Sequence, residues 1–289
     1  MNRRLPPFLL ALWLVAPACA VNPQPVSTPT LPVRESRSSV MLHGKPLELH
    51  LSAPTGRAPA DALILYASGD GGWFGAAVDM FRQIAVAGYS TVGFSSRAFL
   101  KLDRPNGRLV DPQQLASEYE QILVGSRGAL HLGPDTPVIL TGWSRGAAFA
   151  VLAASERGAP RPLQGVVAIG LSDGEDLEVN GPGDGTDDDA PTQGPGHWPF
   201  LPYERIARLG PVRCAVIQAS GDSYLPASRA RDLFGPDTPV RRFYAVDAKN
   251  HRFSGGKDAF DRALLDAIHW MASTPVAEGS REASTRDGR

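Results

Sequence analysis

A Gly-x-Ser-x-Gly pattern lies in the stretch "LTGWSRGAA", where Ser144 stands between Gly142 and Gly146. The pattern follows an apolar run at 138–141 and precedes a helix-like stretch at 146–155. A serine on a sharp strand-to-helix turn holds its hydroxyl out at the edge of a sheet, where it can act as a nucleophile. Small neighbours let the strand and the helix approach closely. Ser144 is therefore a candidate nucleophile, and an ordinary strand-to-helix turn is the alternative.

A serine hydroxyl needs a base that takes its proton, and three histidines follow Ser144 at a distance along the chain. His197 lies in a long loop and His269 in a helical pattern near the end. His251 comes just after the last strand-like run, and sites in open parallel sheets gather at the carboxyl ends of strands. We therefore predict that His251 is the base.

The base in turn needs a carboxylate that orients it. Asp222 ends the run "CAVIQASGD", and chain order places an acid there, between the serine and the histidine. Asp173, after an earlier strand-like run, is a possible substitute, whereas Asp247 is too close to His251 in sequence to reach around the imidazole. Asp222 is the favoured acid.

Two backbone N–H groups must also stabilise the oxyanion that forms at the substrate carbonyl. One is expected from Arg145, the residue after the nucleophile, and the other from Gly69 or Asp70 in the glycine-rich "SGDGGW" at 68–73. A phosphate-binding loop is the alternative for this stretch. It has neither a G-x-G-x-x-G pattern nor a following lysine, so no nucleotide or other cofactor is predicted.

These residues need a scaffold, and apolar runs alternate with helical patterns along most of the chain. Strands are predicted at 40–43, 47–52, 62–67, 91–94, 138–141, 166–171, 215–219 and 242–246, and helices around 78–85, 111–123, 146–155 and 260–271. The first two strands form a hairpin around Gly44. Such alternation predicts an α/β protein with a mostly parallel sheet flanked by helices. With the serine, acid, histidine and glycine loop in this order, we predict the α/β-hydrolase fold.

The segment 173–202 interrupts the alternation. It is long and rich in Asp, Gly and Pro, and we predict a lid-like insertion. The stretch "DGTDDDAP" resembles a calcium-binding loop in composition, but it lacks the alternating ligand spacing and the terminal glutamate. A solvated acidic loop is the better interpretation, so no metal site is predicted.

The two ends of the chain differ from the middle in composition. A basic start and an apolar segment predict a signal peptide over 1–20, with lipidation of Cys19 as an alternative to plain cleavage. We expect a disordered linker at 21–35, one hydrolase domain at 36–273 and a loose tail at 274–289. Cys214 lies in an apolar run and is predicted to be a buried, inert thiol. The net charge of −1, without a basic run, argues against a nucleic-acid binder.

Three stretches resemble the VirJ/AcvB type of bacterial virulence-associated α/β-hydrolase. They are the first stretch "YASGDGGWFGAAVDMFRQIAVAGYSTVGFSS", the nucleophile turn "LTGWSRGAA" and the closing stretch "NHRFSGG", and together they span Tyr66 to Gly256. This sequence departs from the family where Arg145 replaces the usual aromatic residue and where the Asp-rich loop looks enlarged. The resemblance implies a periplasmic serine esterase that releases the amino acid from aminoacyl-phosphatidylglycerol, such as the alanyl or lysyl form.

The resemblance also implies roles for the site residues. Ser144, Asp222 and His251 would be nucleophile, acid and base. For such a substrate, our own hypothesis is that the Arg145 side chain pairs with the lipid phosphate and that Asp70 holds the substrate ammonium. Four aromatic residues would face acyl chains or a membrane surface, and packing around the site is an equal alternative for them: Trp73, Phe74, Trp198 and Phe200.

Two other functions remain open at this point. One is a general secreted carboxylesterase or acyltransferase. The other is a periplasmic assembly factor that uses the fold only as a binding surface, because a fold does not fix a function. The complete set of serine, acid and histidine favours catalysis.

Overall fold

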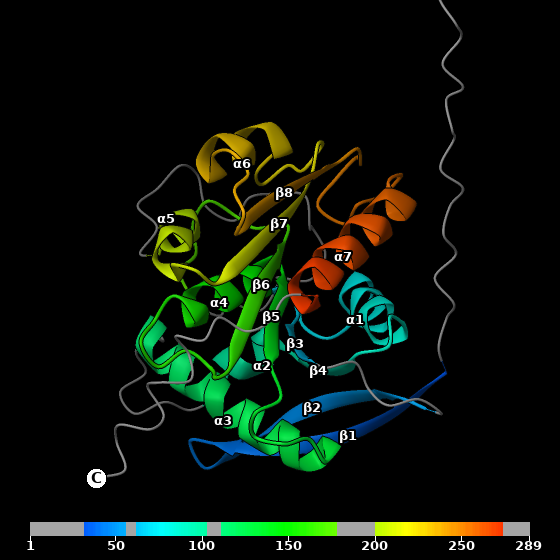
Figure 1. Cartoon of the computed structure of the whole chain (residues 1–289), viewed down its shortest axis with the longest axis vertical. Coiled ribbons are helices and arrows are strands. Elements are labelled where there is room, and N and C mark those ends of the chain that lie inside the picture. The colour runs from blue at the N-terminus through cyan, green and yellow to red at the C-terminus, as the bar shows by residue number, and fades with distance from the viewer. Residues whose placement is uncertain (1–31, 56–61, 103–110, 178–199, 274–289) are drawn as a thin grey trace, which may run out of the picture.

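The computed structural model describes residues 32–55, 62–102, 111–177 and 200–273, and they form one twisted eight-stranded sheet covered by helices (Figure 1). The strand order is β1-β2-β4-β3-β5-β6-β7-β8. Strands β3 to β8 run parallel to one another, and the antiparallel pairings are those of β2 with β1 and with β4. The strands are β1 Val33–Leu42, β2 Lys45–Pro54, β3 Leu63–Ala67, β4 Ser90–Phe94, β5 Val138–Trp143, β6 Leu163–Ile169, β7 Arg213–Ala219 and β8 Arg241–Val246. The prediction of a mostly parallel sheet is confirmed.

The N-terminal hairpin is longer than its hydrophobic alternation predicted. Its turn is made by His43 and Gly44, both with positive φ, which is the geometry that a two-residue hairpin requires. β1 begins at Val33, so the strand takes in the last residues of the segment 21–35 that was expected to be a linker. Backbone pairing with β2 stabilises this edge strand although its side chains are mostly exposed. The rest of the linker, the predicted signal peptide with Cys19, and the tail at 274–289 lie outside the described residues.

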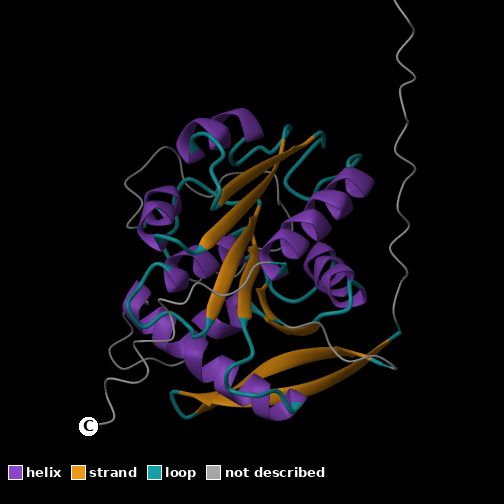
Figure 2. Ribbon diagram, in the orientation of Figure 1, coloured by secondary structure: helices purple, strands orange, loops and turns teal. Residues whose placement is uncertain are grey.

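Helices cover both faces of the sheet (Figure 2). The helices α1 and α7 pack on one face, against a core cluster that includes Ile64, Ile139 and Ile217. The helices α2, α3, α4 and α5 contribute to the cluster on the other face, which includes Leu65 and Leu140. The central strands are mostly apolar because both their faces are covered. The helices are α1 Ala76–Val86, α2 Ser96–Leu100, α3 Pro112–Leu130, α4 Arg145–Ala154, α5 Pro202–Ile206, α6 Ala227–Phe234 and α7 Lys257–Ala272, with a 3₁₀ turn η1 at Ala207–Leu209.

Local signals predicted the long helices well. The Asp111 carboxylate accepts a hydrogen bond from the Gln114 N–H at 2.7 Å, and Pro112 takes the first helical position of α3, as predicted. The helices α2, α5 and α6 were not predicted. α2 and α5 have five residues each, too short for a helical pattern of apolar residues to show. α6 has eight residues and buries only Ala227 and Ala230.

This topology brings the carboxyl ends of β3, β5, β6, β7 and β8 to one edge of the sheet, since these strands are neighbours and run parallel. The segments that follow them carry Gly69, Ser144, Gly170, Asp222 and His251. Within the described part of the chain, no helix has the length and apolar character needed to cross a membrane.

Candidate active site

Ser144 sits on a strained turn between β5 and α4. Its backbone has φ 55° and ψ −121°, a conformation that L-residues rarely adopt. A Cβ on Gly142 would lie 2.1 Å from the Gly146 carbonyl oxygen, and a Cβ on Gly146 would lie 2.1 Å from the Ala67 oxygen. Only glycine fits at either position, as the pattern predicted. The Ser144 N–H donates to the Ile169 oxygen at 2.8 Å, which ties the turn to β6.

Asp222 and His251 form a buried pair at the same edge. The distance between His251 Nδ1 and Asp222 Oδ2 is 2.7 Å, and the two residues are 5% and 1% exposed. The Asp222 carboxylate also accepts the Gln218 side-chain amide at 3.0 Å and the Tyr224 backbone N–H at 2.9 Å. These donors fix the carboxylate, and its bond to Nδ1 leaves the other ring nitrogen to act as a proton acceptor.

Two aromatic rings lie close to the His251 imidazole. Its ring centroid is 5.4 Å from that of Trp143 and 4.9 Å from that of Tyr224. The Trp143 indole donates to the His251 carbonyl at 3.2 Å, so the neighbour of Ser144 contacts the histidine directly. Within the described residues, the buried Nε2 of His251 has no hydrogen-bond partner. Nε2 is the nitrogen that would take the serine proton.

The competing acids and histidines lie elsewhere. Asp173 is exposed, and the exposed Asp247 accepts a hydrogen bond from Ser220 at 3.2 Å. His269 is exposed on α7, and His197 is outside the described residues. Of the predicted acids, Asp222 is the one that bonds the His251 ring.

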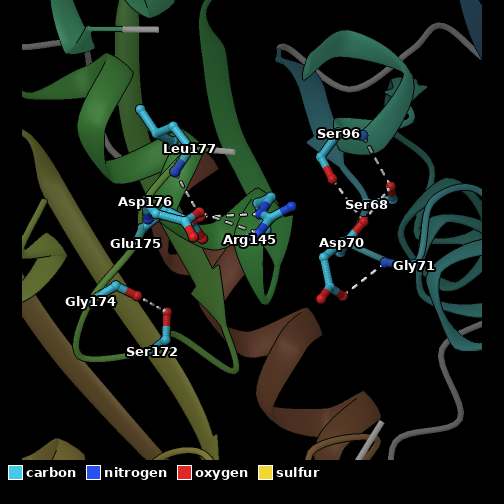
Figure 3. Close-up of polar contacts among 11 residues, drawn as sticks. Ser68, Asp70, Gly71, Ser96, Arg145, Ser172, Gly174, Glu175, Asp176 and Leu177 are labelled. Atoms are coloured by element: carbon cyan, nitrogen blue, oxygen red, sulfur yellow. Dashed lines mark hydrogen bonds and ion pairs between the residues drawn. The ribbon is translucent and has the colours of Figure 1, made fainter. Parts of the chain in front are cut away.

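The glycine-rich loop after β3 passes next to Ser144. A Cβ on Gly69 would lie 3.4 Å from the Ser144 Cβ. The Gly69 carbonyl accepts hydrogen bonds from the Ser96 hydroxyl at 2.7 Å and the Ser68 hydroxyl at 3.1 Å, which anchors the loop (Figure 3). No hydrogen-bond partner for the N–H of Gly69, Asp70 or Arg145 is found among the described residues. This arrangement is compatible with the predicted oxyanion donors.

The side chain of Arg145 has partners inside the protein (Figure 3). Its Nε lies 3.1 Å from Glu175 Oε1, and its Nη2 lies 3.5 Å from Asp176 Oδ1. All three side chains are at most 10% exposed. We call these residues the Arg145 cluster. The expected contact between Arg145 and a lipid phosphate gains no support here, because the guanidinium charge is already paired and covered.

Glu175 is the buried carboxyl at the centre of the cluster. Burial raises the pKa of its carboxyl to about 7, while the nearby Arg145 and the hydrogen bond from the Leu177 N–H act in the opposite direction. The Glu175 carboxylate accepts the backbone N–H groups of Asp176 and Leu177 at 3.1 and 3.0 Å. The backbone of Glu175 also pairs in both directions with Phe200.

The aromatic residues expected at a lipid surface have different surroundings. Trp73 stacks on His50 with ring centroids 4.1 Å apart and packs edge-on against Phe81, so packing explains its position. Phe200 packs against the core. Phe74 is 54% exposed and free to meet a ligand or a surface. Trp198 lies outside the described residues, as does the acidic stretch expected to be a solvated loop.

Sequence reasoning missed several residues around the site. Trp143 was present in the nucleophile motif, but nothing in its spacing indicated that it reaches His251. Gln218 follows four apolar residues in β7, and an amide in an apolar core strand is a signal that a nearby group needs a hydrogen bond. Tyr224 and Glu175 stand in irregular segments that give no periodic signal.

Solved structures with the same architecture are numerous. A dienelactone hydrolase from Anabaena variabilis is 21% identical, with a TM-score of 0.53 over 83% of this chain and 97% of that one. Est1E from Butyrivibrio proteoclasticus is 13% identical, with a TM-score of 0.57 over 82% and 99%. An alpha-beta serine hydrolase homologue from Coxiella burnetii is 12% identical, with a TM-score of 0.54 over 81% and 97%.

These similarities establish the α/β-hydrolase fold and confirm that prediction. No protein-family model matches the chain, and no curated protein sequence matches it. Membership of the VirJ/AcvB group therefore stays a prediction, as do the roles of the individual site residues.

Proposed function

We propose that this chain is a serine ester hydrolase in which Ser144 is the nucleophile, His251 the base and Asp222 the orienting acid. The observation that carries the proposal is the buried 2.7 Å contact between His251 and Asp222, beside a serine on a strained turn. Structures that share the fold include esterases and hydrolases by name, which supports the same reaction class.

Acylation would begin when His251 Nε2 accepts the Ser144 hydroxyl proton while Oγ attacks the ester carbonyl carbon. The carbonyl oxygen becomes an oxyanion, which the N–H groups of Arg145 and of Gly69 or Asp70 would stabilise. The positive end of the α4 dipole points to the same place. When the intermediate collapses, the ester C–O bond breaks and the proton passes from Nε2 to the leaving alcohol.

Deacylation would repeat these steps with water. Nε2 takes a proton from water, the resulting hydroxide attacks the acyl carbon, and the second intermediate releases the acid as the proton returns to Ser144 Oγ. Throughout, the Asp222 carboxylate would stabilise the positive charge that the His251 ring acquires. The enzyme ends each cycle in its starting state, and no cofactor is required.

Labelling with a fluorophosphonate probe tests this chemistry, because the probe reacts with an activated serine. We expect the wild-type protein to be labelled at Ser144 and Ser144→Ala to lose both labelling and ester hydrolysis. Ser155→Ala is the matched control, because Ser155 stands at the opposite end of α4. A folded wild-type protein that neither reacts nor hydrolyses esters would favour a non-catalytic binding role instead.

We further propose the aminoacyl ester of aminoacyl-phosphatidylglycerol as the substrate, in line with the resemblance to the VirJ/AcvB group. The supporting observation is Asp70, a partly exposed carboxylate in the loop beside Ser144. Within the described residues, its hydrogen bond is to the Gly71 N–H at 2.8 Å, and it has no cationic partner. A carboxylate placed there would attract the ammonium group of an aminoacyl ester.

Paired substrates test this assignment. Asp70→Asn keeps an oxygen for the Gly71 N–H but removes the charge. We expect kcat/KM for an alanyl ester to fall by about tenfold or more, since a hydrogen bond to a charged group contributes about 1.5–3 kcal/mol. The rate with an acetyl ester should stay within about twofold, as should both rates in Asp79→Asn on the exposed start of α1. Equal losses on both esters would favour a general carboxylesterase.

We also propose that the protein acts in the periplasm on a membrane surface. The support is the predicted signal peptide, and the lipid substrate requires contact with a bilayer. Cell fractionation should find the protein in the periplasm, and purified protein should release the amino acid from vesicles that contain aminoacyl-phosphatidylglycerol. A cytoplasmic location, or activity on soluble esters alone, would contradict this part of the proposal.

A further inference from the structure

The Arg145 cluster lies beside the nucleophile turn, and the chemistry proposed above does not use its side chains. Arg145 is the first residue of α4, and its guanidinium reaches Glu175 and Asp176, about thirty residues further along the chain. Figure 3 shows its side chain directed at the two carboxylates. The cluster is therefore an internal contact between the start of α4 and the segment after β6.

Burying three charges is costly, and a buried ion pair seldom stabilises a fold more than apolar residues of the same size. The Arg145, Glu175 and Asp176 side chains are 8%, 6% and 10% exposed, so they pay most of that desolvation cost. A buried pair of this kind is better explained by the geometry that it specifies. Here the ion pairs specify the position of Arg145, the residue that follows Ser144 at the start of α4.

The cluster connects three parts of the chain. Glu175 receives the Arg145 side chain, accepts the N–H groups of Asp176 and Leu177, and pairs through its backbone with Phe200. Ser144 has a strained backbone, and strained residues persist only where the surroundings hold them firmly. An anchor on the very next residue would hold that strain in place.

We infer that Arg145 is a positioning residue, whose ion pairs with Glu175 and Asp176 fix the start of α4 so that the Arg145 N–H points at the developing oxyanion. The inference rests on the proposed serine hydrolase function. Arg145 then has two roles: its backbone N–H contacts the reacting oxygen, and its side chain holds that N–H in place. The inference also replaces the expected contact with a substrate phosphate.

The test compares Arg145→Met and Arg145→Lys by kinetics with a small neutral ester such as p-nitrophenyl acetate. Arg145→Met keeps the backbone N–H and much of the side-chain volume but removes the ion pairs. We expect kcat to fall about 10- to 100-fold with KM within twofold, less than the 10²–10³-fold cost of deleting an oxyanion donor. Arg145→Lys keeps the charge and should recover part of the loss.

A second readout separates positioning from a general loss of structure. A trifluoromethyl ketone inhibitor forms a hemiketal with the nucleophile, and its oxyanion occupies the same site as the transition state. Its inhibition constant should rise in Arg145→Met by the same factor by which kcat/KM falls. Arg205→Met is the matched control, because it breaks the part-buried Arg205–Glu156 ion pair at 2.6 Å and should leave both values within twofold.

The outcomes distinguish the two proposals. If the wild-type protein neither hydrolyses esters nor reacts with the probe, the proposed function fails and this inference fails with it. If the wild type is active and folded Arg145→Met keeps its kcat and inhibitor affinity, the inference alone is wrong. It is also wrong if kcat drops while inhibitor affinity is unchanged, or if Arg205→Met loses as much activity as Arg145→Met.

Discussion

Replacing Asp222 with asparagine tests the proposed triad most directly, because the two side chains have the same shape. The Asp222 carboxylate accepts from three described donors: His251 Nδ1, the Gln218 amide and the Tyr224 N–H. Both of its oxygens are used. Asparagine has one acceptor oxygen, so its NH₂ group must take the place of the other carboxylate oxygen and face a donor. If the oxygen stays with Tyr224, the NH₂ meets Nδ1 and forces the ring proton onto Nε2, where no proton can be accepted from Ser144.

The expected loss follows from the same contact. In the transition state His251 is positively charged, and a carboxylate about 4 Å away contributes about 4 kcal/mol at the effective dielectric of a protein site. Losing that amount lowers the rate about 10³-fold, and the wrong tautomer increases the loss toward 10⁴-fold. Asp222→Asn should therefore reduce kcat/KM for p-nitrophenyl acetate by about 10³ to 10⁴-fold while its thermal unfolding remains cooperative.

Asp173→Asn and Asp247→Asn are the matched controls, since both acids follow sheet strands and both are exposed. Each should keep kcat/KM within about twofold. Because the probe also needs a deprotonated serine, fluorophosphonate labelling of Asp222→Asn should slow in parallel. The reasoning is refuted if Asp222→Asn keeps more than about a tenth of the activity, or if Asp173→Asn loses as much.

Three further predictions concern the residues that hold the site in shape. In Gly170→Ala the new Cβ would lie 2.8 Å from His251 Cε1, so kcat/KM should fall at least about tenfold. Gly210→Ala is the control, because Gly210 has a similar φ of +56° and open space around it. This control carries the same backbone cost of about 1–2 kcal/mol and should keep full activity. Gly146→Ala would place a methyl group 2.1 Å from the Ala67 oxygen, and circular dichroism should show loss of the native fold; a native spectrum would contradict the close approach of β3 and α4. For Glu175, the raised pKa means that the folded protein keeps a proton that the unfolded chain has released between pH 4.5 and about 7, so this group's contribution to the free energy of unfolding falls by about 3 kcal/mol as the pH rises through that window. Denaturant titrations of Glu175→Gln should lack this fall, and identical pH dependence in the variant and the wild type would show that Glu175 is not the titrating group.

The parts of the fold that the sequence predicted are those with strong local signals. The strand β3 is apolar at every position because helices cover both its faces, and α3 begins at an aspartate and a proline that favour a helix start. The nucleophile turn was predictable because its glycines are required by contacts between neighbouring elements. The helices α2, α5 and α6 are short or bury few side chains, so their sequences carry no comparable pattern.

The choice between Asp222 and Asp173 needed the structure. Both follow parallel strands, so chain order alone leaves either of them near the histidine. The sheet resolves the difference because β7 lies next to β8, and the turn after β7 brings Asp222 under the His251 ring. For Trp73 the sequence could not decide between packing and contact with a lipid. Its stacking partner His50 belongs to a distant hairpin, and no local pattern connects the two residues.

For Arg145, the need for a buried counter-charge could be predicted from the sequence, but the residues that supply it could not. The rest of α4, "GAAFAVLAA", is apolar or glycine on all sides, as expected for a helix that is buried all round. A charged residue at the start of such a helix has little access to water, and a buried charge requires a counter-charge. The sequence therefore contained a reason to expect an internal carboxylate near Arg145. It could not identify Glu175 and Asp176, because they follow β6 in a segment without periodicity and reach Arg145 only through the pairing of β5 with β6.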